Sequence, residues 1–189
     1  MKIGILGIQG DVYEHYASIK SLKAKYDVDA IIIRSPEEID VIDGLIIPGG
    51  ESTTITKFLS RYINKIEENV KNGMKVMGTC AGAIILSRDT GDSRVNGTGI
   101  INIKIQRNAY GRQIDSFIKE IDIKNIGRFN AVFIRAPVID DPGDSVVLGT
   151  YNEKPVIVEN ENALAMTFHP ELTNDKRVHE YFLRKVTGN

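Results

Sequence analysis

The single cysteine of this chain, Cys80, lies between two glycines in the run Gly78–Gly82, with the sequence GTCAG. Apolar residues on both sides of the run predict a strand, a tight turn and a helix. Such a turn lifts a nucleophile to the end of a sheet, because glycines let neighbouring backbone come close. A helix N-terminus also favours the thiolate, which is the reactive form of cysteine. The alternative is a small buried hydrophobic side chain.

A histidine and a glutamate follow a predicted strand near the C-terminus, in the run His169-Pro170-Glu171. Proline can continue neither a sheet ladder nor an ordinary helix, so we expect a rigid extended turn. Residues two apart in an extended chain point to the same side, and Glu171 could then orient the His169 ring toward a nucleophile. The alternative is a surface histidine and glutamate, which is also our interpretation of His15 and His179.

Two further turns, Gly7–Gly10 and Pro48–Ser52, also follow predicted strands. Consecutive glycines leave backbone N–H groups bare, so Gly49 and Gly50 could help the amide of Ala81 to hold the oxygen of a tetrahedral intermediate. An ordinary turn is the alternative. Neither turn is a dinucleotide fingerprint, because G-x-G-x-x-G does not occur. Open α/β sheets bind ligands at the carboxyl ends of their strands, where we expect these turns and Cys80 to meet.

Four short apolar runs predict buried strands in the first half of the chain. Helical spacing between them indicates parallel strand–helix–strand units, with both faces of the sheet covered. We expect the first helix to begin at a capping box formed by Asp11 and Glu14. Another helix is expected from about residue 52 to 72, with a break near Ser60. The predicted strands are Lys2–Leu6, Ala30–Ile33, Gly44–Ile47 and Val76–Gly78.

From about residue 100 the pattern changes to strands joined by short loops, which predicts added antiparallel or mixed sheet. No linker rich in proline, glycine or serine divides the halves, so we expect residues 1–189 to form a single domain. We expect a closing helix from about Asp175 and a flexible loop at residues 90–97. The predicted strands are Ile100–Ile105, Arg112–Ile121, Ala131–Ile134, Val146–Tyr151, Pro155–Glu159 and Ala163–Phe168.

Composition argues against several classes of protein. The net charge is -1, so there is no basic excess to attract nucleic acid. The apolar runs are far shorter than the ~18 residues that a membrane span needs. A single cysteine excludes an intrachain disulfide and fits a reducing compartment. We therefore expect a cytoplasmic protein without a nucleic-acid or membrane partner.

Together the three motifs Gly78–Gly82, Pro48–Ser52 and His169–Glu171 resemble class I, or triad, glutamine amidotransferase domains. Within that family, blocks spanning nearly the whole chain are similar to the glutaminase subunits of pyridoxal 5'-phosphate synthase. Gln106 departs from the family, which often has an acid there, and residues 90–97 do not align. The similar blocks are Gly7–Gly10, Gly49–Thr54, Arg107–Gln113, Phe133–Pro137 and Phe168–Thr173.

The resemblance implies a three-layer, flavodoxin-like α/β fold whose mostly parallel central sheet is flanked by helices and extended by antiparallel strands. It implies that Cys80 is the nucleophile, His169 the general acid and base, and Glu171 its orienter. The oxyanion hole would be formed by Gly50 and Ala81. Glutamine carries a carboxylate and an ammonium, which need cationic and anionic or carbonyl partners. The implied glutamine-binding residues are Gly49, Gly50, Glu51, Arg107, Ile134 and Arg135.

The implied reaction is the hydrolysis of L-glutamine to L-glutamate and ammonia through a thioester. The implied partner is a (β/α)8-barrel synthase subunit, in a hetero-oligomeric complex, that uses the ammonia to build pyridoxal 5'-phosphate in vitamin B6 synthesis. The glutaminase would be poorly active until this partner docks. Neither a cofactor nor a metal is expected.

Other functions stay open at this point. Peptidase-like cysteine hydrolases on related sheets typically have a histidine directly after the elbow cysteine, where this chain has Ala81. A non-catalytic regulatory subunit would keep only the fold, and the intact Cys80, His169 and Glu171 argue against it. A general-purpose glutaminase would need no partner, so the effect of adding the barrel subunit would distinguish it.

Overall fold

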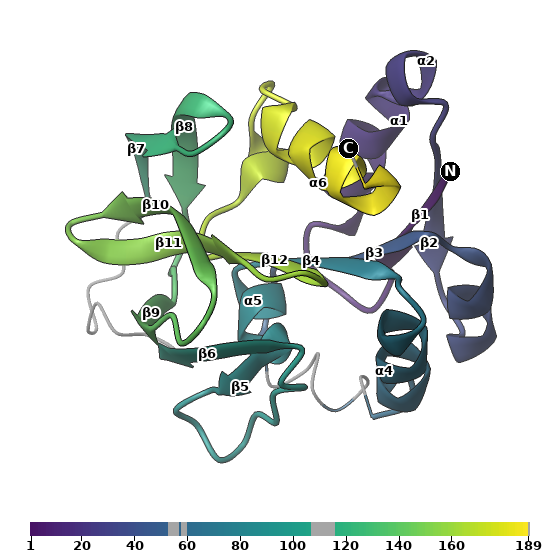
Figure 1. The fold of residues 1–189 in the computed structure, drawn as a ribbon, viewed down its shortest axis with the longest axis horizontal. Coiled ribbons are helices and arrows are strands. Elements are labelled where there is room, and N and C mark those ends of the chain that lie inside the picture. The colour runs from purple at the N-terminus through teal and green to yellow at the C-terminus, as the bar shows by residue number, and fades with distance from the viewer. Residues whose placement is uncertain (53–56, 58–59, 107–115, 189) are drawn as a thin grey trace.

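A seven-stranded sheet with the order β10-β11-β12-β4-β3-β1-β2 forms the middle of the molecule (Figure 1). The computed structural model describes residues 1–52, 57, 60–106 and 116–188. Five neighbouring strands of the sheet are parallel, and two more extend it in antiparallel fashion at one edge. The parallel strands are β1 (Lys2–Leu6), β2 (Asp29–Ile33), β3 (Gly44–Ile47), β4 (Lys75–Thr79) and β12 (Ala163–Met166), and the antiparallel ones are β10 (Val146–Tyr151) and β11 (Lys154–Glu159).

The central strands are apolar along their whole length because both faces of the sheet are covered. In β3, Leu45 and Ile47 lie in the core on one face, and Ile46 lies in the core on the other. All three side chains are 0% exposed. Burying each of them contributes roughly 1.5–3 kcal/mol, so the sheet is stabilised from both sides.

One face of the sheet is covered by α1, α2 and α6, and the other by α4 and α5 (Figure 1). In the part of the chain that the structure describes, no helix is both long enough and apolar enough to span a membrane. The helices are α1 (Val12–Ser21), α2 (Lys23–Tyr26), α4 (Ile63–Lys71), α5 (Ala81–Leu86) and α6 (Arg177–Thr187), with short 3₁₀ helices η1 (Pro36–Val41) and η2 (Pro170–Leu172).

Two smaller sheets add to these layers. A hairpin of β7 (Phe117–Ile123) and β8 (Gly127–Phe133) lies on the face that carries α1 and α6. On the other face lie β5 (Ser87–Asp89), β6 (Ile101–Gln106) and β9 (Val138–Asp141). The hairpin contacts the segment after β12, because the backbone N–H of His169 donates to Val132 O at 2.8 Å.

The strand order places a crevice between the carboxyl ends of β1 and β3. After β1 the chain passes through α1 to β2 on one side, whereas β3 lies on the other side of β1. The helices that follow β1 and β3, α1 and α4, cover opposite faces, so their connections diverge at this point. Ligands of open α/β sheets bind at such a switch point. The turns after β1, β3, β4 and β12 all meet at this edge.

The expected parallel sheet with helices on both faces and added antiparallel strands is confirmed. Strands β1, β3 and β10 have the predicted bounds, whereas β7 runs further than predicted, to Ile123. Residues 112–115 of that predicted strand, and 53–56 and 58–59 of the predicted helix, lie outside the described residues. Strands β5 and β9 were not predicted, because three or four residues with mixed burial carry no clear periodicity.

The capping box expected at Asp11 is wrong. Helix α1 does begin directly after Asp11, but the Asp11 side chain makes no capping hydrogen bond. Its carboxylate instead lies 3.1 Å from the imidazole of His169, so a tertiary contact replaces the local one. The helix also breaks at Leu22 into α1 and α2.

Candidate active site

Cys80 lies at the turn between β4 and α5, with φ 48° and ψ -106°. A positive φ at a residue with a side chain costs of order 1–3 kcal/mol, as expected of a strained nucleophile turn. Close contacts explain the flanking glycines. A Cβ on Gly78 would lie 2.6 Å from the carbonyl of Gly82, and a Cβ on Gly82 would overlap the carbonyl of Ile47. The thiol is therefore held at the carboxyl edge of the sheet, where it is 8% exposed.

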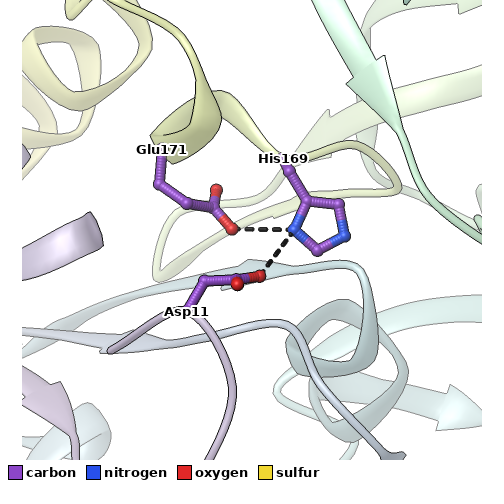
Figure 2. Close-up of side chains that lie close together, drawn as sticks. All are labelled: Asp11, His169 and Glu171. Carbon is purple, nitrogen blue, oxygen red and sulfur yellow. Dashed lines mark hydrogen bonds and ion pairs between the residues drawn. The ribbon is translucent and has the colours of Figure 1, made fainter. Parts of the chain in front are cut away.

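His169 follows β12 and is held through one ring nitrogen. Its Nδ1 lies 2.8 Å from Glu171 Oε1 and 3.1 Å from Asp11 Oδ2 (Figure 2). Its Nε2 has no hydrogen-bond partner among the described residues. Two carboxylates therefore orient the ring and leave Nε2 available for proton transfer.

Charge interactions keep His169 protonated. Burial acts to lower the pKa of His169, but its interactions with Asp11, Cys80 and Glu171 outweigh burial and raise the pKa to about 12. Burial likewise acts to raise the pKa of Glu171, yet His15 and His169 hold that pKa well below its usual range. The resting site thus holds an imidazolium beside two carboxylates, ready to act as an acid.

A cavity of about 330 Å³ opens beside Cys80 and His169. This volume is at the small end of the range for ligand pockets. The thiol of Cys80 lies 3.9 Å from the carbonyl oxygen of Ile134, whose neighbour Arg135 has a positive φ of 43°. Charged, apolar and backbone groups share the lining, which includes Glu51, Cys80, Ala81, Ile134, Arg135 and His169.

The turn after β3 lies between Cys80 and His169. A Cβ on Gly49 would be 2.5 Å from Cε1 of His169 and 3.4 Å from Cβ of Cys80, so only glycine fits. The Gly49 N–H donates to Thr79 Oγ1 at 3.0 Å. The turn after β1 supports this arrangement, since Gln9 Nε2 donates to Glu51 O at 2.8 Å.

Asp11, His169 and Glu171 also place their polar atoms within 4.8 Å of one another, as metal ligands do. The carboxylates lie at hydrogen-bond distance from one protonated nitrogen, Nδ1. A metal bound there would replace the proton that orients the ring. We therefore interpret the cluster as an acid–base group.

A model of the SNO glutamine amidotransferase family matches residues 5–188. The chain belongs to this family. A relative from Picrophilus torridus, pyridoxal 5'-phosphate synthase subunit PdxT, is 80% identical over 189 residues, which is the full length of both chains. The subunit of the same name from Thermoplasma acidophilum is 51% identical over 191 residues and covers 100% of this chain and 94% of its own.

Solved structures agree with this assignment. The crystal structure of a glutamine amidotransferase superposes with a TM-score of 0.91 at 38% identity, over 98% of each chain. The glutaminase domain of Trypanosoma brucei CTPS, solved with bound acivicin, reaches a TM-score of 0.68 at 12% identity over 100% of this chain and 94% of its own. The second likeness shows the shared fold alone.

The structure brings most of the predicted site residues of this glutamine amidotransferase together. Cys80, His169, Gly50, Glu51, Ala81, Ile134 and Arg135 line the cavity, with Gly49 and Glu171 directly behind His169 and Cys80. Arg107, predicted to bind glutamine, lies outside the described residues.

The expected extended turn at Pro170 is wrong. Pro170–Leu172 forms the 3₁₀ helix η2, whose first position accepts proline because no N–H is needed there. Glu171 still reaches Nδ1 of His169, at 2.8 Å. The predicted contact is therefore made by a tighter backbone than expected.

Asp11 was not among the predicted site residues, and His15 and His179 were predicted to lie on the surface. Both histidines are 0% exposed rather than on the surface, and His15 Nε2 lies 3.3 Å from Glu171 Oε2. One signal was present: Asp11, which directly precedes α1, and His15 are four residues apart and therefore lie on the same side of the helix. Nothing in the sequence indicates that this face meets His169 and Glu171.

Proposed function

We propose that this chain is the glutaminase subunit of a pyridoxal 5'-phosphate synthase. It hydrolyses L-glutamine with Cys80 as nucleophile, His169 as acid and base, and Glu171 as orienter. The observation that carries the proposal is the 80% identity over the full length of a relative that is such a subunit. The Cys80–His169–Glu171 arrangement at the cavity supports it.

Glutamine would enter the cavity with its side-chain amide at Cys80 and its α-carbon groups toward the charged lining. Arg135 and Arg107 would bind the α-carboxylate, and Glu51 the ammonium. Gly49 and the backbone at Ile134 would complete the site. The lining residues Glu51, Ile134 and Arg135 already surround one cavity, which supports this assignment.

In the first half of the reaction, the Cys80 thiolate attacks the side-chain amide carbon of glutamine. The backbone N–H groups of Gly50 and Ala81 hold the oxyanion that forms. The His169 imidazolium gives its proton to the amide nitrogen, the carbon–nitrogen bond breaks, and ammonia leaves. A γ-glutamyl thioester remains on Cys80. The raised pKa of His169 means that this proton is present at the start.

In the second half, His169 is neutral because it has given its proton away. It takes a proton from water, whose oxygen attacks the thioester carbonyl. The carbon–sulfur bond breaks, releasing glutamate and restoring the thiolate beside the imidazolium. One glutamine and one water thus give one glutamate and one ammonia.

The ammonia passes to a (β/α)8-barrel synthase subunit in a hetero-oligomeric complex. All 189 residues form one glutaminase domain in this proposal, and the complex is cytoplasmic. The support is that the relatives are subunits of pyridoxal 5'-phosphate synthase. The partner completes the oxyanion hole, so the isolated chain is poorly active.

Replacing the nucleophile tests the proposal. The variant Cys80→Ala, assembled with the synthase subunit, should lose glutamine-dependent synthesis of pyridoxal 5'-phosphate. Synthesis from added ammonium salt should continue at the wild-type rate, because the synthase is untouched. Glutamine-dependent synthesis by the variant would contradict the proposal.

Glutamine hydrolysis with and without the synthase subunit tests the need for a partner. The synthase should raise turnover of the wild-type chain, and a glutamine-mimicking diazo-ketone should label Cys80 in the complex. Equal turnover with and without the subunit would indicate a self-sufficient glutaminase. An unlabelled Cys80 in the complex would indicate a non-catalytic scaffold.

A further inference from the structure

Buried polar side chains continue from Glu171 into the core. His15 of α1, Thr79 at the end of β4 and His179 of α6 are each 0% exposed. His15 Nε2 lies 3.2 Å from Thr79 Oγ1 and 3.3 Å from Glu171 Oε2. His15 Nδ1 lies 3.1 Å from His179 Nε2. Neither histidine touches the cavity, and the reaction above uses neither of them.

The proton on His179 can be assigned from its surroundings. Burial lowers the pKa of His179 to about 3, so the ring is neutral at neutral pH and carries a single N–H. Its Nδ1 has no hydrogen-bond partner among the described residues. Buried N–H groups without an acceptor are rarer in proteins than buried acceptors without a donor, so Nδ1 is the less favourable place for the proton. The proton is therefore on Nε2 and points to His15 Nδ1.

This assignment determines the tautomer of His15. Because Nδ1 of His15 accepts from His179, its own N–H must be on Nε2. That N–H donates to Thr79 Oγ1, and Glu171 Oε2 lies close by, 3.3 Å from Nε2. Glu171 Oε2 forms no hydrogen bond in the described parts of the chain, so its 3.3 Å contact with His15 Nε2 is a close polar contact. The opposite tautomer would place a lone pair against a buried carboxylate oxygen.

The Nε2–H of His15 is also linked, through Thr79, to the turn that contains Gly49. Thr79 Oγ1 has two acceptor positions, which suit the N–H of Gly49 and the Nε2–H of His15. Gly49 belongs to the turn between Cys80 and His169. His15 therefore contacts the acid directly and the oxyanion turn through one hydroxyl.

We propose that His15 is a positioning residue of this active site. It donates its Nε2–H to Thr79 and lies in close polar contact with Glu171, and so fixes the acid and the Gly49 turn relative to each other. By donating to Nδ1 of His15, His179 determines the direction in which the hydrogen bonds run, from His179 through His15 to Thr79. The inference rests on the proposed function, in which Glu171 orients His169.

Histidine NMR tests the tautomers in the full-length wild-type chain, whether or not the enzyme turns over. The chain has three histidines, so long-range ¹H–¹⁵N spectra can be assigned with single substitutions. His15 and His179 should each show a protonated Nε2 and a bare Nδ1. A protonated Nδ1 at either ring would overturn the inference. This result is independent of the Cys80→Ala test, so the two failures are distinguishable.

Kinetics of the complex with the synthase subunit test the positioning role. The variant His15→Leu, without a donor, should lower kcat for glutamine about 100-fold, because small displacements of catalytic groups have effects of this size. KM should change little, since the cavity lining is intact. His15→Gln, whose amide can place an N–H near Nε2, should recover most of kcat.

A matched control separates positioning from helix packing. Ile19→Ala removes another fully buried side chain of α1 and leaves the acid untouched. It should lower stability and keep kcat. The inference fails if His15→Leu has no more effect on kcat than Ile19→Ala, or if His15→Gln is as slow as His15→Leu. Should His15→Leu not fold, His15→Gln and the wild-type spectra still decide.

Discussion

At the scale of single residues, His169, the proposed acid and base, has an asymmetric environment. Nδ1 faces two carboxylates, and Nε2 has no partner among the residues that the structure describes. Only one of these acids, Glu171, belongs to the predicted triad. The other, Asp11, comes from the opposite end of the chain and is about one-third exposed.

Asp11→Asn should lower the pKa of His169, because the neutral amide no longer favours the imidazolium. The folded-state pKa of about 12 lies above the ordinary 6.5, so between these values the folded chain keeps a proton that the unfolded chain has released. The stabilisation is full below pH 6.5 and is lost as the pH rises toward 12. NMR titration of His169 and unfolding at several pH values measure both effects.

Asp175→Asn is the matched control, since that carboxylate pairs with Arg177 rather than with His169. It should leave the titration of His169 unchanged. An unaltered pKa of His169 in Asp11→Asn would show that Glu171 and Cys80 alone hold the proton.

At the scale of elements, the strand-end turns depend on close contact between backbones and catalytic side chains. The β3 turn fits between Cys80 and His169 only because Gly49 has no side chain. The turn after β4 needs glycine at both ends for the same reason.

Gly49→Ala should fold but lose about 100-fold in kcat, because the new Cβ displaces His169 from its position beside Cys80. Gly149→Ala is a milder control away from the site, since its Cβ would lie 3.1 Å from the nearest atoms, a tight contact but one without overlap, and the residue lies in β10. Steady-state assays of both variants in the complex with the synthase make the comparison. A wild-type kcat for Gly49→Ala would mean that the turn moves freely.

At the scale of the whole molecule, two hydrophobic cores on opposite faces of the sheet stabilise the carboxyl edge of the strands, where the site lies. Helix α6 contributes to one of them through Phe182, which is 0% exposed and lies near Gly44 of β3. The same helix supplies His179 to the buried polar chain. The packing of α6 therefore also affects the position of Glu171, through His179 and His15.

Phe182→Ala should lower the free energy of unfolding by about 3–5 kcal/mol, the usual cost of removing a buried phenylalanine side chain. Ile118→Ala removes a side chain that is 64% exposed and should change it by less than about 0.5 kcal/mol. Guanidinium unfolding of the isolated chain measures both. Equal midpoints would show that α6 adds little to the core.

The family and the parallel sheet could be predicted from the sequence, and both predictions are confirmed, whereas the roles of Cys80, His169 and Glu171 stay a prediction. Apolar strands with helical segments between them leave few arrangements, and the turns after β1, β3, β4 and β12 must then meet at one edge. The motifs around Cys80 and His169 carry enough information to propose roles, because a cysteine nucleophile needs an adjacent base that a third group orients.

Only the tertiary structure decided what surrounds the triad. Asp11 has the local pattern of a helix cap, and His15 and His179 have that of ordinary helix residues. Their contacts with His169, Glu171 and Thr79 join positions far apart in the chain. Local propensity carries no information about such contacts, because they depend on how α1 and α6 pack against the sheet.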